Sequence, residues 1–424
     1  MSVLFPLQAT GGLDTPTAQP QFKSVAGDGN RPLDTGCEIF SSEQVFSPLM
    51  LIKQSAIQHN QQALAAWCRE QGVLLAAHGK TSMSAAVLRQ AVAAGAWGLS
   101  AATPAQVRAL RSFGVRNVFL ANELVDAAGI RWIGEWQRQH PEHQFLCYVD
   151  SLKGVALLDR HLAASGVTLS VLVEVSQPGG RTGCRTADEA LAIAQAVQSS
   201  AHLSLVGVAG YEGAIAAGRD EAALTTVRTY CQKLCDISTM LADNALFATD
   251  TPILSAGGGA YFDVVVSSFK AANLPQPPVI LIRAGAYMAH DDGLYARIAP
   301  FAQPNSPYQL HSALEIWGRV LSRPEPGLAL LDFGRRDVPF DQDMPIPHAI
   351  RNEDGSAPRK ADGMHISDVN DQHAYLRVPE SDPLAPGDWV GCGISHPCTA
   401  FDKWRYLPLV DDHYRVTDAA YTAF

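Results

Sequence analysis

The sequence predicts an α/β protein in which a parallel (β/α)8 barrel is followed by a second, mostly β domain. Two observations carry this prediction. Eight short apolar, β-like runs alternate with helical stretches between residues 73 and 283, which is typical of parallel strands joined by crossover helices. After about His311 the runs are separated by Pro, Gly and Asp instead, which favours a domain built mainly from strands.

The order of elements divides the chain into three parts. Residues 1–47 are rich in Gly, Pro, Thr and Gln, and we expect an irregular arm that contributes to the β domain. The barrel is expected over 48–311, where the helical spacing of Pro48–Gly72 supplies the missing eighth helix. The β domain is expected over 312–424. An open doubly wound sheet is the alternative, although no Gly-x-Gly-x-x-Gly follows the first run, so a dinucleotide-binding version is unsupported.

The individual elements follow from local pattern. The eight barrel strands are expected at Val73–Ala77, Trp97–Ala101, Val118–Ala121, Phe145–Val149, Leu169–Val175, Leu203–Ala209, Pro252–Ser255 and Val279–Arg283. Helices are expected between them at Pro104–Phe113, Asp126–Gln139, Leu152–Ala164, Ala187–Ser199 and Arg219–Asn244. In the second domain, strands are expected at Leu314–Leu321, Leu328–Phe333, Ala374–Val378, Trp389–Ile394 and Tyr414–Thr417, with Arg351–Gly363 as an exposed polar loop.

Composition limits the classes of function. The 424 residues carry a net charge of −10 and no basic run, which argues against nucleic acid as a partner. We expect no signal peptide, because the first thirty residues lack a basic start followed by an apolar core, and no membrane span. The eight cysteines are scattered, which fits a reducing compartment, and we expect a cytoplasmic protein. Only 17% of residues are charged, which suggests extensive buried surface and an oligomer.

The stretch Val73–Lys80 is the most informative one in the chain. It is an apolar run that ends in His78-Gly79-Lys80. Chemistry in barrels of this kind takes place at the carboxyl ends of the strands, so Lys80 is a candidate for Schiff-base formation with a carbonyl group. The alternative is a lysine that extends along the surface at the end of a strand.

Other reactive residues follow the later strands. Arg181 and Tyr211 come after the fifth and sixth runs, Gly257-Gly258-Gly259 after the seventh, and Tyr287 after the eighth. Consecutive glycines can present backbone N–H groups to an anion, and phosphate sites of these barrels often lie after strands seven and eight. Taken singly, these residues could be a tight turn, a surface arginine and core tyrosines. Together with Lys80 they indicate pyridoxal phosphate.

A last cluster lies in Ser395-His396-Pro397-Cys398-Thr399. His396 and Cys398 are two positions apart after an apolar run, so on an extended segment they point to the same side. Imidazole and thiolate suit zinc or another transition metal with open positions. The alternative is a structural His and Cys.

Taken in order, these motifs resemble those of a known group. They are His78-Gly79-Lys80-Thr81, Glu174 with Gly180-Arg181-Thr182-Gly183, Gly210-Tyr211-Glu212-Gly213, Gly257–Gly259, Arg283–Tyr287, Asp371–His373 and His396–Thr399. From about residue 45 onward the chain resembles the metal-activated D-serine dehydratase and D-threonine aldolase family, fold-type III pyridoxal-phosphate enzymes with an alanine-racemase-type N-terminal barrel.

The resemblance implies a role for each motif. Lys80, next to His78, would carry pyridoxal 5'-phosphate, with Arg181 and Tyr211 orienting the ring. Gly257, Gly258, Gly259 and Tyr287 would bind the phosphate. In the β domain, His396 and Cys398 would bind a divalent metal, with zinc expected first and manganese or magnesium as alternatives. Relatives of this fold are commonly homodimers, and we expect one here.

The resemblance also suggests an activity. Aldolases of the group usually have His-x-Asp as metal ligands, whereas the dehydratases have His-x-Cys, so Cys398 favours dehydration. We expect conversion of a D-3-hydroxy amino acid such as D-serine to a 2-oxo acid and ammonia, with Lys80 as the base. The alternative is retro-aldol cleavage to glycine and an aldehyde. A racemase fits less well because it needs a second base and no metal, and a non-catalytic cofactor carrier would not need the His-x-Cys pair.

Overall fold

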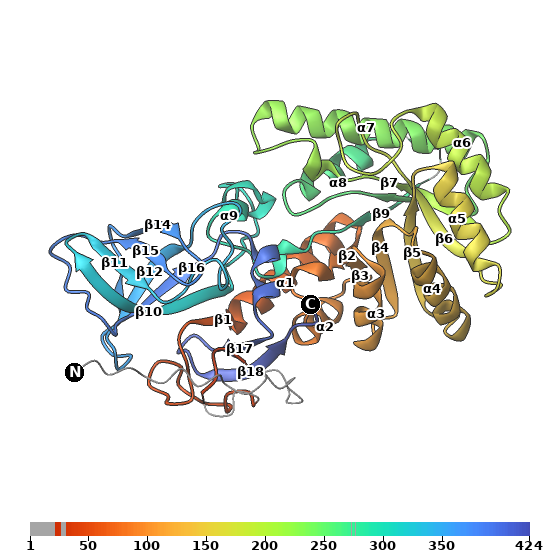
Figure 1. Cartoon of the computed structure of the whole chain (residues 1–424). Helices are drawn as coiled ribbons and strands as arrows, with labels where there is room; N and C mark the ends of the chain where they lie inside the picture. Colours follow the sequence, from red (N-terminus) through yellow and green to blue (C-terminus); the bar gives the residue numbers. More distant parts are fainter. Residues whose placement is uncertain (1–21, 27–30, 273, 276) are drawn as a thin grey trace, which may run out of the picture.

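The computed structural model describes residues 22–26, 31–272, 274–275 and 277–424, and most of the expected arm therefore lies outside the described residues. The chain forms a barrel and a separate curved β sheet that lie side by side, with the C-terminus between them (Figure 1). Within the described ranges, no helix combines the length and apolar character needed to cross a membrane.

Eight parallel strands close the barrel in sequence order, with the last strand paired to the first. The predicted barrel is therefore confirmed and the open-sheet alternative is excluded. The strands are β2 (Leu74–His78), β3 (Gly98–Ala101), β4 (Asn117–Glu123), β5 (Gln144–Val149), β6 (Leu169–Glu174), β7 (Leu203–Ala209), β8 (Ile253–Ser255) and β9 (Val279–Ile282).

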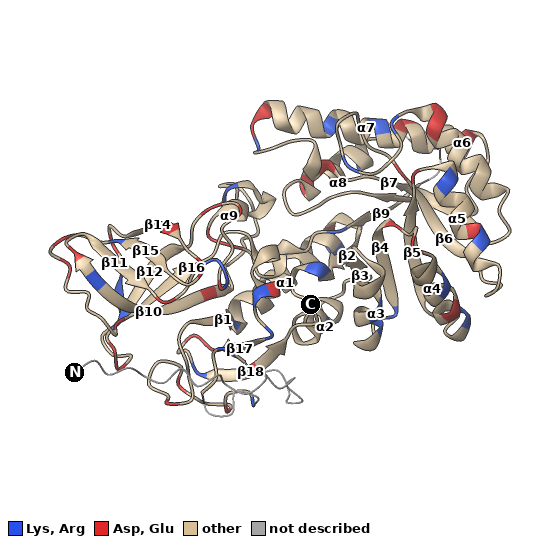
Figure 2. Cartoon of the chain, viewed as in Figure 1, with Lys and Arg blue, Asp and Glu red and all other residues tan. Residues whose placement is uncertain are grey.

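Helices surround the barrel on the outside. They are α1 (Gln54–Gln71), α2 (Ala85–Ala93), α3 (Pro104–Ser112), α4 (Ala127–Gln139), α5 (Leu152–Leu162), α6 (Ala187–Gln198), α7 (Glu221–Asp243) and α8 (Phe262–Ala271), and a short α9 (Leu294–Ile298) leads toward the β domain. Residues of both charges are spread over α4, α5 and α7, whereas α6 carries acidic residues only (Figure 2). The opposite faces of these helices pack on the strands in one large apolar core.

Strand alternation explains the two layers of packing. Leu75 and Ala77 of β2 point outward into the core under the helices, whereas Ala76 between them points into the barrel. The interior is a separate apolar cluster that includes Phe119, Tyr148 and residues from four further strands. The barrel is therefore filled by side chains, and its functional surface is the rim rather than a pore.

The second domain is a ten-stranded sheet. Its strands are β1 (Leu49–Lys53), β10 (Leu314–Glu325), β11 (Leu328–Leu331), β12 (Ile346–Arg351), β13 (Arg359–Lys360), β14 (His365–Val369), β15 (Ala374–Arg377), β16 (Trp389–Gly393), β17 (Tyr406–Val410) and β18 (Val416–Tyr421). The main path runs β13-β12-β16-β10-β1-β17-β18, while β11, β15 and β14 extend the sheet from β10.

The start of this sheet corrects one prediction. The sequence predicted a single helix over Pro48–Gly72, but Leu49–Lys53 form β1, which pairs with β10 and β17, and the helix begins only at Gln54. The described arm residues Val25, Leu33, Ile39 and Phe40 pack against β-domain side chains such as Trp317. The predicted loop Arg351–Gly363 also contains the short strand β13.

Candidate functional site

A cavity of about 480 Å³ opens at the carboxyl ends of the barrel strands, where the β domain faces the barrel. Both domains line it, with residues from strand ends, from the turns that follow them and from the C-terminus. The lining residues are His78, Lys80, Thr81, Gln106, Ala121, Tyr148, Glu174, Arg181, Tyr211, Gly258, Gly259, Arg283, Gly285, Ala286, Tyr295, His396, Cys398, Thr399, Asp402 and Phe424.

Lys80 lies in this cavity because β2 ends in a tight turn. The segment Gly79–Thr81 is a single 3-10 turn. At Gly79 a Cβ atom would lie 3.1 Å from Leu110 Cδ2 and 3.3 Å from Ser100 O, so the turn packs closely against its neighbours. His78, just before the turn, lines the same cavity, and its Nδ1 is buried with no hydrogen-bond partner among the described residues.

Positive charge converges on the cavity. Burial lowers the pKa of His78 well below its usual value, and the nearby cations Lys80, Arg283 and Arg181 lower it further. The imidazole is therefore neutral. A site with three cations around a neutral histidine is suited to an anionic ligand.

Arg181 and Tyr211 come together as the sequence predicted. The Arg181 guanidinium lies over the Tyr211 ring at 4.3 Å from its centroid. Arg181 comes from the loop after β6 and Tyr211 from the turn after β7. Burial and the charge of Glu212 raise the pKa of Tyr211 to about 12, so its hydroxyl remains protonated. The pair forms one wall of the cavity.

Two backbone amides of the glycine run after β8 already donate hydrogen bonds to another residue of the protein. The amides of Gly257 and Gly258 donate to Glu212 Oε2 and Oε1 at 3.0 and 2.6 Å. Gly257 does not line the cavity, whereas Gly258 and Gly259 do. Among the described residues, no acceptor is found for the Gly259 amide. A Cβ there would lie 2.6 Å from Tyr295 Cε1, so only glycine fits. Of the three amides in this run that were expected to bind a phosphate, the amide of Gly259 is therefore the one available.

Tyr287 lies elsewhere. It belongs to the 3-10 turn Ala286–Met288, is 3% exposed, and is absent from the cavity lining. Burial raises the pKa of its phenol, with a smaller contribution from Cys68 of α1. The tyrosine side chain belongs to the apolar core shared with the outer helices, and its contact with a phosphate stays a prediction.

The floor of the cavity holds three polar residues to which the sequence analysis assigned no role. Arg283 is buried and donates to Gly210 O at 2.6 Å and to Ser255 Oγ. Tyr148 and Glu174 line the cavity, and the Tyr148 hydroxyl and Glu174 Oε2 have no hydrogen-bond partner among the described residues. Unpartnered buried polar atoms cost free energy, so atoms that face a cavity in this way indicate a polar ligand.

Behind Glu174 lies a second carboxyl group. Burial and the charges of Glu174 and Asp150 raise the pKa of Glu123 to about 9. Because this value lies above the unfolded value near 4.5, the folded protein holds more protons between these two pH values. The free energy of unfolding must therefore fall as pH rises through this window.

We predict that Glu123→Gln stabilises the protein at pH 8 by roughly 2–4 kcal/mol, since glutamine reproduces the neutral, hydrogen-bond-donating form. Urea unfolding at pH 6 and pH 9 measures this, and the variant should show less loss of stability between the two. The exposed Glu380→Gln serves as control. A variant that is less stable than the parent at pH 9 would contradict the prediction.

The metal-ligand candidates reach the cavity from the β domain. The turn Pro397–Thr399 follows His396, and His396 and Cys398 both line the cavity. Cys398 Sγ lies 3.3 Å from Thr81 Oγ1, next to Lys80. Burial lowers the pKa of His396, but contact with Cys398 and Asp341 outweighs this effect and raises it to about 9.

The donor chemistry of His396 and Cys398 fits zinc or a related divalent metal. Among the described residues there is no group of three or more His, Cys, Asp or Glu that could hold a metal. A metal here would have two protein ligands and open positions toward the cavity. His373 and Asp371 of the motif Asp371–His373 do not line the cavity and are exposed in the turn between β14 and β15.

The donors for pyridoxal phosphate also fit. Lys80 can hold an aldehyde, Arg181 and Arg283 provide cations, Gly259 offers an amide, and Tyr148 and Glu174 present unpartnered atoms. Sequence reasoning did not find Gln106, Tyr295 or Asp341, because none of them belongs to a recognised motif. The sequence feature that could have identified Tyr148 is its position near the carboxyl end of a predicted barrel strand.

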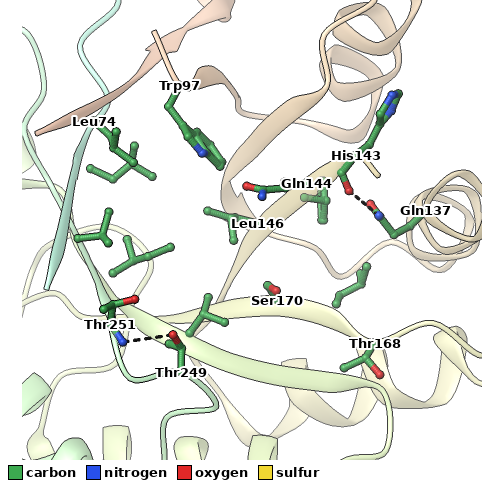
Figure 3. A pocket seen from close by; sticks show the side chains of 16 residues that line it. Leu74, Trp97, Gln137, His143, Gln144, Leu146, Thr168, Ser170, Thr249 and Thr251 are labelled. Atoms are coloured by element: carbon green, nitrogen blue, oxygen red, sulfur yellow. Dashed lines mark hydrogen bonds between the residues drawn. The ribbon is translucent and has the colours of Figure 1, made fainter. Parts of the chain in front are cut away.

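A second cavity of about 490 Å³ lies at the opposite, amino-terminal end of the barrel (Figure 3). Side chains such as Trp97, Gln144, Thr168 and Thr251 line it, and the Thr251 amide donates to Thr249 Oγ1 at 3.2 Å. Since the two volumes are nearly equal, size does not identify the functional cavity. The second one contains no Lys, Arg, Asp, Glu or Cys among its described lining residues, so the chemistry points to the first.

Two family models match the chain. The alanine racemase N-terminal domain covers residues 52–262, and the putative serine dehydratase domain covers residues 313–410. The second match contains both His396 and Cys398. The two matches fall on the barrel and the β domain, respectively.

The individual proteins that resemble this chain share little sequence identity with it. A 3-hydroxy-D-aspartate aldolase of Paracoccus denitrificans is 23% identical over 175 residues, which span 41% of this chain and 45% of the relative. The structure of D-threonine aldolase from Filomicrobium marinum has a TM-score of 0.74 at 22% identity, covering 89% of this chain and 95% of that one.

A further structure, D-threo-3-hydroxyaspartate dehydratase from Delftia sp. HT23, has a TM-score of 0.71 at 20% identity, covering 89% and 97% of the two chains. At these identities the structural likeness shows the fold. Together with the two domain matches, it shows that the chain belongs to the fold-type III family in which an alanine racemase N-terminal barrel is joined to a serine dehydratase-type β domain.

Proposed function

We propose that the protein is a pyridoxal-phosphate- and divalent-metal-dependent dehydratase of a D-3-hydroxy amino acid such as D-serine. The products are a 2-oxo acid and ammonia. The observation that carries the proposal is the 3.3 Å contact between Cys398 Sγ and Thr81 Oγ1, because it brings the His-x-Cys pair beside the turn of Lys80 in a single cavity.

The residues of the cavity have separate tasks in this proposal. Lys80 would hold the cofactor, Arg181 and Tyr211 would flank its ring, and Gly259 would receive its phosphate. The cofactor supplies an electron sink for charge at Cα. Lys80 Nζ would remove the α-proton as general base, because an amine in this cavity can accept a proton from the substrate.

His396 and Cys398 would hold the metal, which supplies Lewis-acid stabilisation of the β-oxygen. The substrate thus loses a proton at Cα and hydroxide at Cβ, which combine as water, and the released enamine hydrolyses to the oxo acid and ammonia. For D-serine the overall reaction gives pyruvate and ammonia.

The second candidate is retro-aldol cleavage to glycine and an aldehyde. It is supported by two of the relatives, which are named as aldolases. In that reaction the β-hydroxyl loses its proton and the Cα–Cβ bond breaks. Cys398 favours dehydration, because His-x-Cys is the ligand pattern that the family resemblance associates with dehydratases.

The test is a product assay with pyridoxal phosphate and Zn²⁺ or Mn²⁺ added. We expect D-serine and D-threonine to give 2-oxo acid and ammonia in equal amounts, with no glycine. The L-enantiomers serve as controls. Glycine with acetaldehyde from D-threonine would identify an aldolase instead, and turnover that is unchanged by chelators would contradict the metal-dependent mechanism.

A further inference from the structure

We propose that Asp341 is a positioning residue that fixes the imidazole of His396 for binding a divalent metal. The inference rests on the metal site of the proposed function and extends it to a residue outside the cavity lining. Asp341 lies in the segment between β11 and β12, and its Oδ2 is 2.6 Å from His396 Nδ1. Fifty-five positions separate the two residues in sequence, so only the fold brings them together.

The contact determines which ring nitrogen is available. An ionised carboxylate can only accept hydrogen bonds, so Asp341 requires the proton of His396 to be on Nδ1. In the neutral imidazole, which is the form that binds a metal, Nε2 then keeps its lone pair and is the atom that faces the ion. A carboxylate partner also makes the imidazole a more basic ligand and prevents rotation of the ring.

Asp341 is itself held in place. Thr399 Oγ1 donates to Asp341 Oδ1 at 2.7 Å, so both carboxylate oxygens are committed to the turn that carries the metal ligands. The same carboxylate therefore contacts the ring of one metal ligand and the hydroxyl of the residue that follows the other.

The backbone of His396 supports a functional role for this arrangement. His396 has φ 94° and ψ 85°, a left-handed conformation that residues other than glycine rarely adopt. Its N–H donates to buried Asp291 Oδ2 at 3.2 Å, which holds the strained residue in place. Strain of this kind persists only where several contacts enforce it, and it is most common at active sites. Asp291 fixes the backbone, and Asp341 fixes the ring.

Asp343 provides a matched control. It is two positions away in the same segment, and its side chain is 37% exposed, compared with 39% for Asp341. Asp343 Oδ2 accepts from Arg297 at 2.7 Å and from Ser395 Oγ at 3.0 Å, but has no contact with the His396 ring. A change at Asp343 therefore tests the structural contribution of the segment alone.

The experiment measures the Kd for Zn²⁺ of the full-length protein by competition with a chromophoric chelator. The variants are Asp341→Ala, Asp341→Asn, Asp343→Asn and His396→Ala. We expect Asp341→Ala to bind Zn²⁺ about 10–100-fold more weakly than the parent. Asp341→Asn should recover part of this loss, since its amide oxygen can still accept from Nδ1–H. Asp343→Asn should leave the Kd unchanged.

The outcomes separate this inference from the proposed function. If His396→Ala loses Zn²⁺ while both Asp341 variants bind like the parent, Asp341 is not a positioning residue although the metal site stands. Equal weakening by the Asp341 and Asp343 substitutions would also overturn the inference, because the effect would then be structural. If the parent and His396→Ala bind Zn²⁺ equally poorly, the metal site fails and the inference fails with it.

Discussion

Lys80→Ala is expected to lower kcat/KM for the D-3-hydroxy amino acid by about 10³-fold or more. The substitution removes two contributions at once, since the same amine would hold the cofactor and take the α-proton. No second lysine lines the described part of the cavity, and the strongly lowered pKa of His78 makes its imidazole a weak base, so it is a poor substitute for Lys80. Steady-state kinetics, with cofactor content measured after gel filtration, provides the test.

Two controls separate these contributions. Added methylamine should restore part of the rate if proton removal is the step that was lost. Lys153→Ala, an exposed lysine on α5, should leave both activity and cofactor content unchanged. A Lys80→Ala protein that retains a tenth or more of the parent activity would show that another group is the base.

His396→Ala and Cys398→Ala are expected to produce the second largest effect. Each leaves one protein ligand at a site that is open to the cavity, and one ligand does not retain a divalent ion against dialysis. We expect metal content to fall below about a tenth of the parent value and the elimination rate to fall by roughly 10²–10³-fold. Metal analysis by mass spectrometry and an oxo-acid assay measure the two effects.

The prediction for Cys398→Ala needs its own control. Cys37 is also a partly exposed free thiol, but it lies in the N-terminal arm, far along the chain from the metal ligands. Cys37→Ser should therefore retain both metal and activity. If Cys398→Ala keeps its metal and its turnover, the thiol is structural and the choice between dehydration and aldol cleavage would have to rest on other residues.

The barrel could be predicted from sequence because each strand is a short apolar run followed by a turn, and each outer helix has its own apolar periodicity. β1 was missed because Leu51 and Ile52 also fit the helical spacing of the residues that follow them. β17 was missed because Pro408 interrupts its pattern, and proline cannot donate to a strand ladder. Pro408 is tolerated here as a residue paired with Ala419 of β18.

The location of cavity residues was predictable where they lie in the turns and loops after barrel strands, as with Lys80, Arg181 and Tyr211. Tyr287 also follows a strand, yet the 3-10 turn directs its ring into the core, and no local pattern indicates such a rotation. The pairing of Asp341 with His396 depends on how two distant segments of the β domain pack. Likewise, the occupation of two glycine amides by Glu212 could only be found from the three-dimensional structure.

The position of β1 affects how the chain can fold during synthesis. Residues 49–53 lie in the middle of the sheet between β10 and β17, although about 260 residues separate β1 from β10. The barrel strands can therefore pair while the ribosome is still at work, but β1 must wait for both of its neighbours to emerge. The β domain, and with it the turn that carries His396 and Cys398, is completed last, and a shortened chain that begins after Lys53 would expose two unpaired edges at its centre.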